Sequence, residues 1–319
     1  MAYTQTDDSY RTIFSLAIPL ILSMAGFTFM QVIDAVMLSW YSPHAVAAVG
    51  PGGMTSFFLQ SIFSATAGYT STFTAQYIGA KKPFKAHAYL WQGIHFSVFS
   101  GALIFGVSFL MGGFFDRLGH DPLLASMEQQ YFNVTCWGAS FSILTNALIG
   151  FFSGIGRTKL ILGINMAGFT VNGILDYLLI FGVFGLPEGG VWGAAYATVF
   201  AQAMELLLLL FFYRTHEDSR EALSRKCYRF SRQSFLRFMS FGLPNGFRFS
   251  IEIFAWMIFL FFVGRIGVKE LASSNIAWRI NGIAFFPVIG LSQAVNIIAG
   301  QSRGMEKEGK TVFRVTRKG

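Results

Sequence analysis

The sequence predicts an all-α polytopic membrane protein. Hydrophobic residues make up 53% of the 319 residues and charged residues only 13%, well below the roughly 25% of a soluble domain. The apolar stretches are long enough to cross about 30 Å of hydrocarbon as helices. Runs such as Leu206 to Phe212 lack the alternation of a membrane β-strand, which favours helices over a barrel.

Eight apolar stretches are the expected spans. They cover 13–39, 46–78, 88–114, 129–152, 160–186, 191–213, 237–263 and 270–300. The polar N-terminus has no basic cluster and the first stretch is too long for a cleaved signal, so we expect no signal peptide. Cys136 lies in the fourth span and Cys227 in a basic loop, a placement that predicts neither a disulfide framework nor a metal site.

Lys and Arg follow the even-numbered spans. They are Lys81, Lys82 and Lys85 after the second span, Arg157 and Lys159 after the fourth, and a basic run from Arg214 to Arg237 after the sixth. The loops after spans one, three and five contain only Arg117. By the positive-inside rule, the even-numbered loops and the N-terminus face the cytoplasm. The net charge of +8 then follows from topology, and we expect no nucleic acid as a partner.

The sequence contains an internal repeat. Pro19 in the first span recurs as Pro244 in the seventh, and the same separation relates several other pairs: Ser15 and Ser240, Ala47 and Ala272, Gln76 and Gln301, Gly79 and Gly304, Lys82 and Lys307, and Lys85 and Lys310. Agreement at one separation over two spans and a loop indicates duplication. Six spans separate the copies, an even number, which predicts a parallel repeat about an axis along the membrane normal.

The repeat sets the predicted domains. Residues 1–213 would form an N-terminal six-helix lobe, residues 214–236 a cytoplasmic basic linker, and residues 237–319 a partial C-terminal lobe of two helices. A complete second copy would extend well beyond residue 319. We therefore expect about 8 of 12 transmembrane helices and a C-terminally truncated chain.

Polar residues converge inside three predicted spans. Asp34 and Asp176 each cost roughly 2.5 to 3.5 kcal/mol to place at mid-bilayer, so they favour a role in ion or substrate handling. Asn172 and Asp176 are four residues apart, on one helix face. At about 1.5 Å per residue, Asp34, Asp176 and Thr198 share a depth in the outer half of the lobe.

The oxygens of Asp34, Asn172, Asp176 and Thr198 suit a hard cation such as Na⁺. A buried carboxylate pair equally suits a proton, because desolvation and mutual repulsion raise its affinity for protons. The alternative is that both carboxylates bond locally to Asn172, Thr198 or backbone and only fix helix packing.

Other residues in the spans leave alternatives open. Glu252 could bind a cation or pair with Arg248, four residues earlier on the same face. His95 could relay protons or pack in the core, and Glu205 has no assigned partner. We expect several glycines to allow close helix approach: Gly26, Gly101, Gly106, Gly150, Gly154 and Gly156.

The chain has 37 Phe, 11 Tyr and 12 Met, most of them expected to face lipid or pack in the core. A cavity between the lobes would inherit many of these side chains. Such walls bind flat, apolar cations by stacking, cation–π contact and adaptable sulfur contacts.

Several motifs resemble the multidrug and toxic compound extrusion (MATE) family, of the NorM and DinF type, over nearly the whole chain. The matching stretches are Ile18-Pro19-Leu20, Val32-Ile33-Asp34, Ala75 to Ala80, Gly154 to Lys159, Asn172 to Asp176, Phe184 to Thr198, and Gly242-Leu243-Pro244 with Glu252. The stretch from Phe184 to Thr198 is the most specific.

The resemblance implies a secondary active multidrug efflux antiporter that works by alternating access. It would export hydrophobic, mostly cationic small molecules in exchange for H⁺ or Na⁺, without a cofactor and without enzymatic activity. We expect a monomer in the lipid bilayer of the bacterial cytoplasmic (inner) membrane.

The resemblance also implies roles for individual residues. The cation or proton coupling site would be Asp34, Asn172, Asp176 and Thr198. Glu252 matches an acidic residue of a C-lobe cation site, and Pro19 matches a proline at which the first helix bends. A further acidic residue of the family has no position in this sequence.

Two other readings remain open. A lipid-linked oligosaccharide flippase of the same superfamily would need a cationic cavity, whereas intramembrane cations here are few beyond Arg248 and Arg279. A non-functional transporter fragment is the other. A membrane enzyme is disfavoured, because the sequence contains no Gly-x-Ser-x-Gly or His-Glu-x-x-His motif, and nothing specific supports a channel or receptor.

Overall fold

The structure is a computed structural model that describes residues 10–215, 222, 226–266 and 268–305. Within this part of the chain every regular element is a helix, which confirms the predicted all-α membrane fold. In chain order they are α1 (Tyr10–Tyr41), α2 (Pro43–Gly68), α3 (Thr70–Gly79), α4 (Pro83–Leu110), the 3₁₀ helix η1 (Phe115–Leu118), α5 (Pro122–Trp137), α6 (Ala139–Gly154), α7 (Thr158–Phe181), the 3₁₀ helix η2 (Val183–Gly185), α8 (Gly190–Thr215), α10 (Arg232–Ile266) and α11 (Val268–Gly304). Much of the expected linker, and Lys307 and Lys310 of the repeat, lie outside the described residues.

Most of the expected spans correspond to long apolar helices. Six of them, counting α2 and α3 as one, are long and apolar enough to cross a membrane, and the bent pair of α5 and α6 would make a seventh. The span expected at 237–263 lies in α10, which carries Arg237, Arg248 and Glu252 and is not among these candidates. The chain is therefore a multi-pass membrane protein.

Two expected spans are broken, which the sequence analysis did not predict. The chain breaks at Tyr69 between α2 and α3, and at Gly138 between α5 and α6, where the axes bend by 47°. A Cβ on Gly138 would run into Val199 of α8, so this glycine lets the bend pack directly on α8. Both α5 and α6 pack on α2, α4 and α8, and after the break α6 also packs on α3 and α7.

The fourth span also begins earlier than its apolar pattern suggests. Asp121 caps α5 by accepting hydrogen bonds from the backbone N–H of Leu123 (2.9 Å) and Leu124 (3.4 Å), and Pro122 occupies the first turn. Both features are typical of a helix N-terminus. The first turns of α5 therefore carry residues that the expected boundary at 129 left outside the membrane region, including Glu128.

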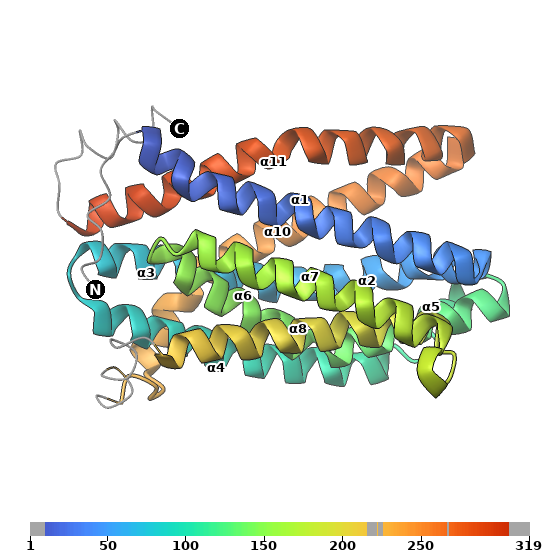
Figure 1. Ribbon diagram of the computed structural model, residues 1–319, viewed down its shortest axis with the longest axis horizontal. Coiled ribbons are helices and arrows are strands. Elements are labelled where there is room, and N and C mark those ends of the chain that lie inside the picture. The colour runs from blue at the N-terminus through green and yellow to red at the C-terminus, as the bar shows by residue number, and fades with distance from the viewer. Residues whose placement is uncertain (1–9, 216–221, 223–225, 267, 306–319) are drawn as a thin grey trace.

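Helix α1 lies between α11 and α7 (Figure 1). In its first half it packs on α11, where Ile13, Leu16 and Ala17 meet Ala294 and other buried residues. Farther along, it packs on α7, where a Cβ on Gly26 would lie 3.0 Å from the ring of Phe169. Pro19 sits inside this continuous helix, where it removes one backbone donor and favours a bend.

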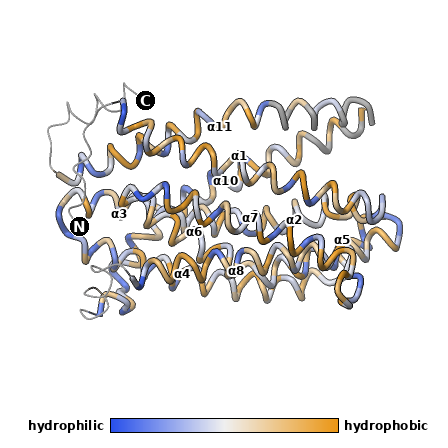
Figure 2. The backbone as a smooth tube through the Cα atoms, in the orientation of Figure 1, coloured by the Kyte–Doolittle hydropathy of each residue, from blue (hydrophilic) through white to orange (hydrophobic). Residues whose placement is uncertain are grey.

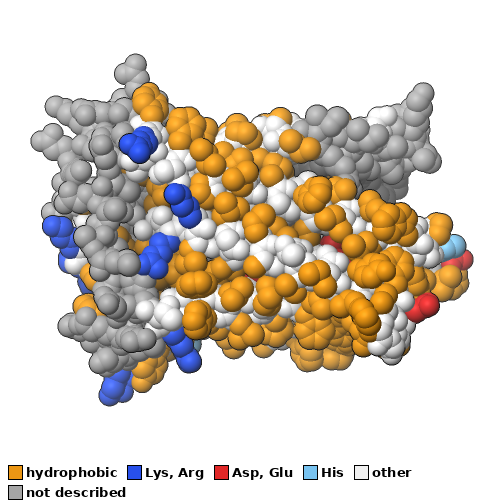
Figure 3. All heavy atoms as spheres, in the orientation of Figure 1, with side chains coloured by type: hydrophobic (Ala, Val, Ile, Leu, Met, Phe, Trp, Pro, Cys, Tyr) orange, Lys and Arg blue, Asp and Glu red, His pale blue; other side chains and the backbone are white. Residues whose placement is uncertain are grey.

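The bundle is apolar along its length and polar at its ends (Figure 2). On the face shown in Figure 3, Lys and Arg gather at one end, and most of the visible Asp, Glu and His lie at the other. We call the end with the α3–α4 and α6–α7 connections the basic end; it carries Lys81, Lys82 and Arg157. The acidic end has the α7–α8 connection and the start of α5, with Glu188 and His120.

The glycines expected at helix contacts fall into two groups. Added Cβ atoms would press on neighbouring helices at Gly26, Gly101, Gly150 and Gly154, as expected. The expectation was wrong for two others. Gly106 has nothing within 4 Å, and Gly156 instead takes a left-handed conformation (φ +83°) in the turn before α7.

Gly101→Ala should destabilise the protein, whereas Gly106→Ala on the same helix should not. The new Cβ at position 101 would lie 2.7 Å from the Cα of Ser140, so α4 and α6 must separate. We expect a loss of about 1 to 3 kcal/mol in the free energy of unfolding, and no loss at position 106, where Ala favours the helix. Thermal unfolding in detergent measures both. Equal melting temperatures for the two variants would contradict the close packing of α4 on α6.

Candidate functional site

Asp34 of α1 and Asp176 of α7 face each other in the acidic half of the bundle. Their side chains lie within hydrogen-bonding reach, and Asp176 is fully buried. One oxygen of Asp34 and both oxygens of Asp176 are buried without a donor in the described part of the chain. Two carboxylates cannot donate to each other, so this pair requires a shared proton or a bound cation.

Asn172 lies one turn from Asp176 on the same face of α7. It is also fully buried, and neither its amide oxygen nor its amide nitrogen has a hydrogen-bond partner among the described residues. Buried amide groups are rarely left unpaired. The alternative in which Asn172 merely bonds to the carboxylates for packing therefore has no support from these contacts.

Tyr131 of α5 joins the same group, which the sequence analysis missed. Its hydroxyl lies near the side chain of Thr198 and close enough to Asp34 and Asp176 for direct electrostatic interaction. Thr198 also donates to the Ala194 carbonyl at 3.1 Å. Four helices therefore contribute to one cluster, which we call the carboxylate cluster: Asp34, Tyr131, Asn172, Asp176 and Thr198.

Glycines bring α7 and α8 together beside the cluster. Gly182 ends α7 in a left-handed conformation, and the Gly189 N–H then donates to the Leu179 carbonyl at 2.9 Å. A Cβ on Gly189 or Gly193 would press on that same carbonyl. This close hairpin sets Thr198 beside Asp176, which explains why the stretch from Phe184 to Thr198 is rich in glycine.

Helix α2 closes the other side of Tyr131. A Cβ on Gly53 would lie 3.3 Å from the tyrosine ring, and a Cβ on Gly52 would lie 2.7 Å from the backbone oxygen of Glu128. Any larger side chain at these two positions would push α2 away from α5. The Gly52–Gly53 pair thus allows α2 to pack directly against the ring of Tyr131.

A shallow groove of about 520 Å³ runs between α1 and α7 next to the cluster. Its walls are mostly apolar and aromatic, from Ile33, Met37, Phe169, Ile174 and Tyr177. Ile33 precedes Asp34 in the chain, and the groove residue Gly173 follows Asn172. Its volume falls within the range of small-molecule sites, and the groove is open on one side.

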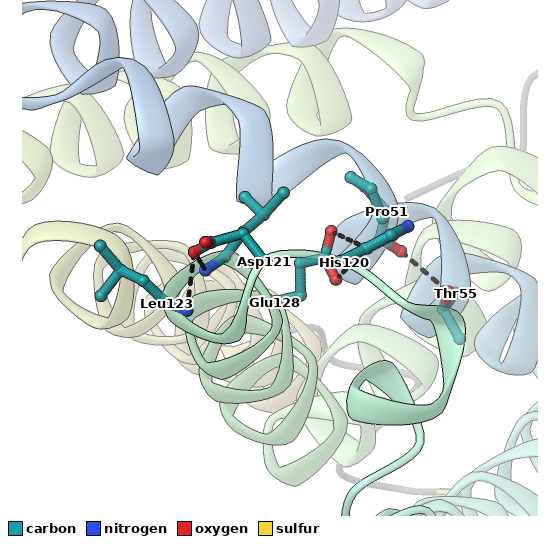
Figure 4. A network of polar contacts seen from close by, with 7 residues as sticks. Pro51, Thr55, His120, Asp121, Leu123 and Glu128 are labelled. Carbon is teal, nitrogen blue, oxygen red and sulfur yellow. Dashed lines mark hydrogen bonds and ion pairs between the residues drawn. The ribbon is translucent and has the colours of Figure 1, made fainter.

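A second polar pair, between a partly exposed histidine and a buried carboxyl group, lies toward the acidic end (Figure 4). The His120 Nδ1 lies 3.0 Å and 2.9 Å from the two oxygens of Glu128. The side chain of His120 is 35% exposed and that of Glu128 is 0% exposed. The sequence analysis did not single out either residue as functional.

Glu252 forms the ion pair, and His95 the packing contacts, that the sequence analysis gave as alternatives to ion binding and proton relay. Arg248 pairs with Glu252 at 3.0 Å, with both side chains exposed on α10, so the intrahelical ion pair forms. The His95 ring packs against Trp91 and Phe230, and its Nδ1 has no partner in the described residues. The side chain of Arg279 lies outside the described part.

Glu205 of α8 occupies a space left by a glycine. A Cβ on Gly168 of α7 would overlap the Glu205 carboxyl group. Gly168 is one turn from Asn172 toward the basic end, so Glu205 lies next to the carboxylate cluster but is not part of it.

A family model described as MatE matches residues 19–178 and 244–317, which together cover most of the chain. The matched ranges include Asp34, Tyr131, Asn172 and Asp176, and they resume at Pro244.

The chain is also similar to named bacterial proteins. It is 27% identical over 290 residues to the probable multidrug resistance protein NorM of Agrobacterium fabrum, which covers 91% of this chain and 62% of the relative. It is 28% identical over 309 residues to the multidrug resistance protein MdtK of Klebsiella pneumoniae, which covers 95% and 66%. The chain thus spans a little less than two thirds of the length of these relatives.

Solved structures have the same fold. An outward-facing multidrug resistance MATE family transporter of the MOP superfamily matches with a TM-score of 0.87 and 22% identity, over 99% of this chain and 68% of that one. A MOP superfamily transporter from Pyrococcus furiosus, described as having a binding pocket of reverse polarity that suggests a different function, matches with a TM-score of 0.86 and 21% identity, over 99% and 69%.

Asp176→Asn should stabilise the protein and Asn172→Asp should destabilise it. The first change removes one of two facing buried carboxyl groups, and the second adds a third to the cluster. We expect changes of about 1 kcal/mol or more in the free energy of unfolding, with opposite signs, because like charges in a low-dielectric site repel strongly. Thermal unfolding in detergent without Na⁺ checks both. A loss of stability in both variants would indicate that Asp176 only supports packing.

Proposed function

We propose that this chain, which belongs to the MatE family, acts as a secondary active multidrug efflux antiporter that exchanges organic cations for H⁺ or Na⁺. The observation that carries the proposal is the facing pair of Asp34 and Asp176. A carboxyl pair without hydrogen-bond donors is far more stable with one bound cation or proton than with none. The relatives named for multidrug resistance support export of small molecules.

The residues of the cluster have distinct roles in this proposal. Asp34 and Asp176 provide the charge that binds the coupling ion. The Tyr131 and Thr198 hydroxyls and the Asn172 amide supply neutral oxygens, which would complete the shell of Na⁺ or hydrogen-bond to the protonated pair. The ion is a transported substrate, so no resident cofactor is required.

Helix α1 couples the ion site to the rest of the bundle. Its second half carries Asp34 against α7. Its first half contains Pro19 and packs on α11. When the coupling ion neutralises the pair, the repulsion between α1 and α7 disappears. Helix α1 can then repack by bending at Pro19, where one backbone hydrogen bond is already missing.

The groove between α1 and α7 is the proposed drug surface. Its aromatic and methionine walls suit flat apolar cations, and Asp34 lies beside it. A drug cation and a coupling ion would compete for the same negative charge, so the repacking of α1 would narrow the groove as the ion binds.

The driving force depends on the charge of the drug. One charge crossing about 100 mV releases about 2.3 kcal/mol, which sustains roughly a 50-fold gradient of a neutral drug at one ion per molecule. One-for-one exchange with a monovalent organic cation moves no net charge. The chemical gradient of the ion must then drive export.

The orientation in the membrane follows from the charges at the two ends. We place the basic end and the N-terminus in the cytoplasm and the acidic end outside, in the bacterial inner membrane and as a monomer. The carboxylate cluster then lies in the outer half, where it can take up ions from outside.

A lipid-linked oligosaccharide flippase is the weaker alternative. It would need cationic side chains around a pyrophosphate. The carboxylate cluster contains two acidic side chains and no Lys or Arg, and Arg248 on α10 pairs with Glu252. The acidic cluster favours a cation-coupled transporter.

Efflux of ethidium from pump-deficient bacteria tests the proposal, with the chain expressed from the full reading frame that contains it. Asp34→Asn and Asp176→Asn should each reduce gradient-driven efflux by at least about 10-fold, because each removes a charge that binds the coupling ion. An imposed H⁺ or Na⁺ gradient identifies the ion.

Asp116→Asn is the matched control, because this exposed carboxylate lies in η1 at the acidic end, away from the cluster. It should leave efflux unchanged. If Asp176→Asn kept both efflux and its ion dependence, the cluster would not be the coupling site.

A further inference from the structure

We propose that His120 and Glu128 form a proton-entry station that delivers protons from the acidic end to the carboxylate cluster by way of Tyr131. The inference rests on the proposed function, and it adds two residues and a direction of entry. It applies to the H⁺-coupled form of the antiporter.

The pair connects solvent to the protein interior. His120 is partly exposed just before α5, and its Nδ1 lies within 3.0 Å of both oxygens of the fully buried Glu128 (Figure 4). An imidazole ring can accept a proton on one nitrogen and release a proton from the other. A proton can therefore pass from the solution to a buried carboxylate in two short transfers.

The helix start fixes this geometry. Asp121 caps α5 through the Leu123 and Leu124 N–H groups, and Pro122 restricts the first turn. His120 therefore leaves the helix in a defined direction, over the residue two turns farther along, which is Glu128. The pair is part of an ordered helix end.

Glu128 continues the path toward the cluster. Tyr131 is three residues farther along α5, so the two side chains are neighbours on one face. Gly52 and Gly53 of α2 press on this face at Glu128 and Tyr131, respectively. Beyond Glu128, the Tyr131 hydroxyl lies near Asp34 and Asp176. Helix α2 thus covers α5 at both of these positions.

The proton count balances at each step. Protonated His120 gives its Nδ1 proton to the Glu128 carboxylate, the ring then turns, and Nδ1 takes another proton from the outer solution before the ring returns. Glu128 then passes its proton to the Tyr131 hydroxyl oxygen as that hydroxyl releases its own proton to Asp34 or Asp176. One proton has entered, and His120, Glu128 and Tyr131 are restored.

Few other ionisable groups belong to the elements packed on α5, which are α2, α4, α6, α8 and η1. They are His44 in α2; Lys85, His87, Tyr89 and His95 in the basic half of α4; Tyr196, Glu205, Tyr213 and Arg214 in α8; and Asp116 and Arg117 in η1, with none in α6. Within the described part of the chain, Glu128 hydrogen-bonds through its carboxylate to His120 and to none of these groups. His120 is therefore the one described route of exchange between Glu128 and solvent.

The competing explanation is that the pair only clamps the start of α5. An entry route affects the rate of proton uptake from the acidic end only. A clamp affects the stability of the protein, and it changes proton uptake from both ends equally. Glu128→Gln separates them, because glutamine still accepts a hydrogen bond from His120 but cannot carry a proton.

The experiment measures proton uptake by purified protein in liposomes after a rapid pH drop, with a pH indicator in the acidified compartment. The drop is applied to the acidic end in one preparation and to the basic end in the other, using liposomes of opposite protein orientation. The variants are Glu128→Gln, His120→Gln, the double variant Asp34→Asn with Asp176→Asn, and the exposed control Glu188→Gln.

We expect Glu128→Gln and His120→Gln to slow uptake from the acidic end by at least about 10-fold, since loss of a positioned proton carrier costs about 100-fold or more. Uptake from the basic end and the final amount of bound proton should match the wild type, as should every measurement on Glu188→Gln. His120→Gln changes a partly exposed residue, so it keeps the test decisive if Glu128→Gln fails to fold.

Wild-type rates in both variants, or equal slowing from both sides, would overturn the entry station while leaving the proposed function intact. Failure of the proposed function has a different signature. In that case the wild type would take up no more protons than the double variant, and the entry station would fall with it.

Discussion

The structure depends on two carboxyl groups held face to face in a medium that cannot solvate them. Asp34 and Asp176 come from different helices, and three of their oxygens have no donor in the described residues. Without a bound cation or proton, α1 and α7 repel each other at this point. The glycine contacts of α7 and α8 and the placement of Tyr131 bring further helices close around this pair.

Helix α1 makes that local repulsion relevant to the whole molecule. One half carries Asp34 against α7, and the other half packs on α11 at Ile13, Leu16 and Ala17. A change of charge at the pair therefore acts on a helix that belongs to two packing surfaces. Pro19 is the position where that helix can bend most easily.

Much of this could be predicted from the sequence, because buried charges in apolar segments stand out. The spacing of Asn172 and Asp176 and the estimated depths of Asp34 and Thr198 were sufficient to place them in one region. Tyr131 was missed because a tyrosine in an apolar helix resembles any core or lipid-facing aromatic residue. Its role depends on the rotation of α5 between the helix start at Asp121 and the break at Gly138.

Glu128 was missed for a related reason. The apolar pattern begins at 129, but the helix begins at Pro122, so one buried carboxylate appeared to lie in a loop. The Asp-Pro pair at 121 and 122 is the signal that could have located the true start. The opposite error occurred at Gly106, where a glycine in an apolar helix indicated packing that the structure does not have.

The central claim is that a drug cation and the coupling ion compete for the Asp34–Asp176 pair, and a count of protons tests it most directly. Ethidium is added to the purified protein in weakly buffered lipid nanodiscs, and the protons released are measured with and without Na⁺. Competition predicts release of about one proton per bound ethidium, or displacement of ethidium by Na⁺, since coupled binding is reciprocal. Ethidium binding that releases no proton and is insensitive to Na⁺ would contradict the account.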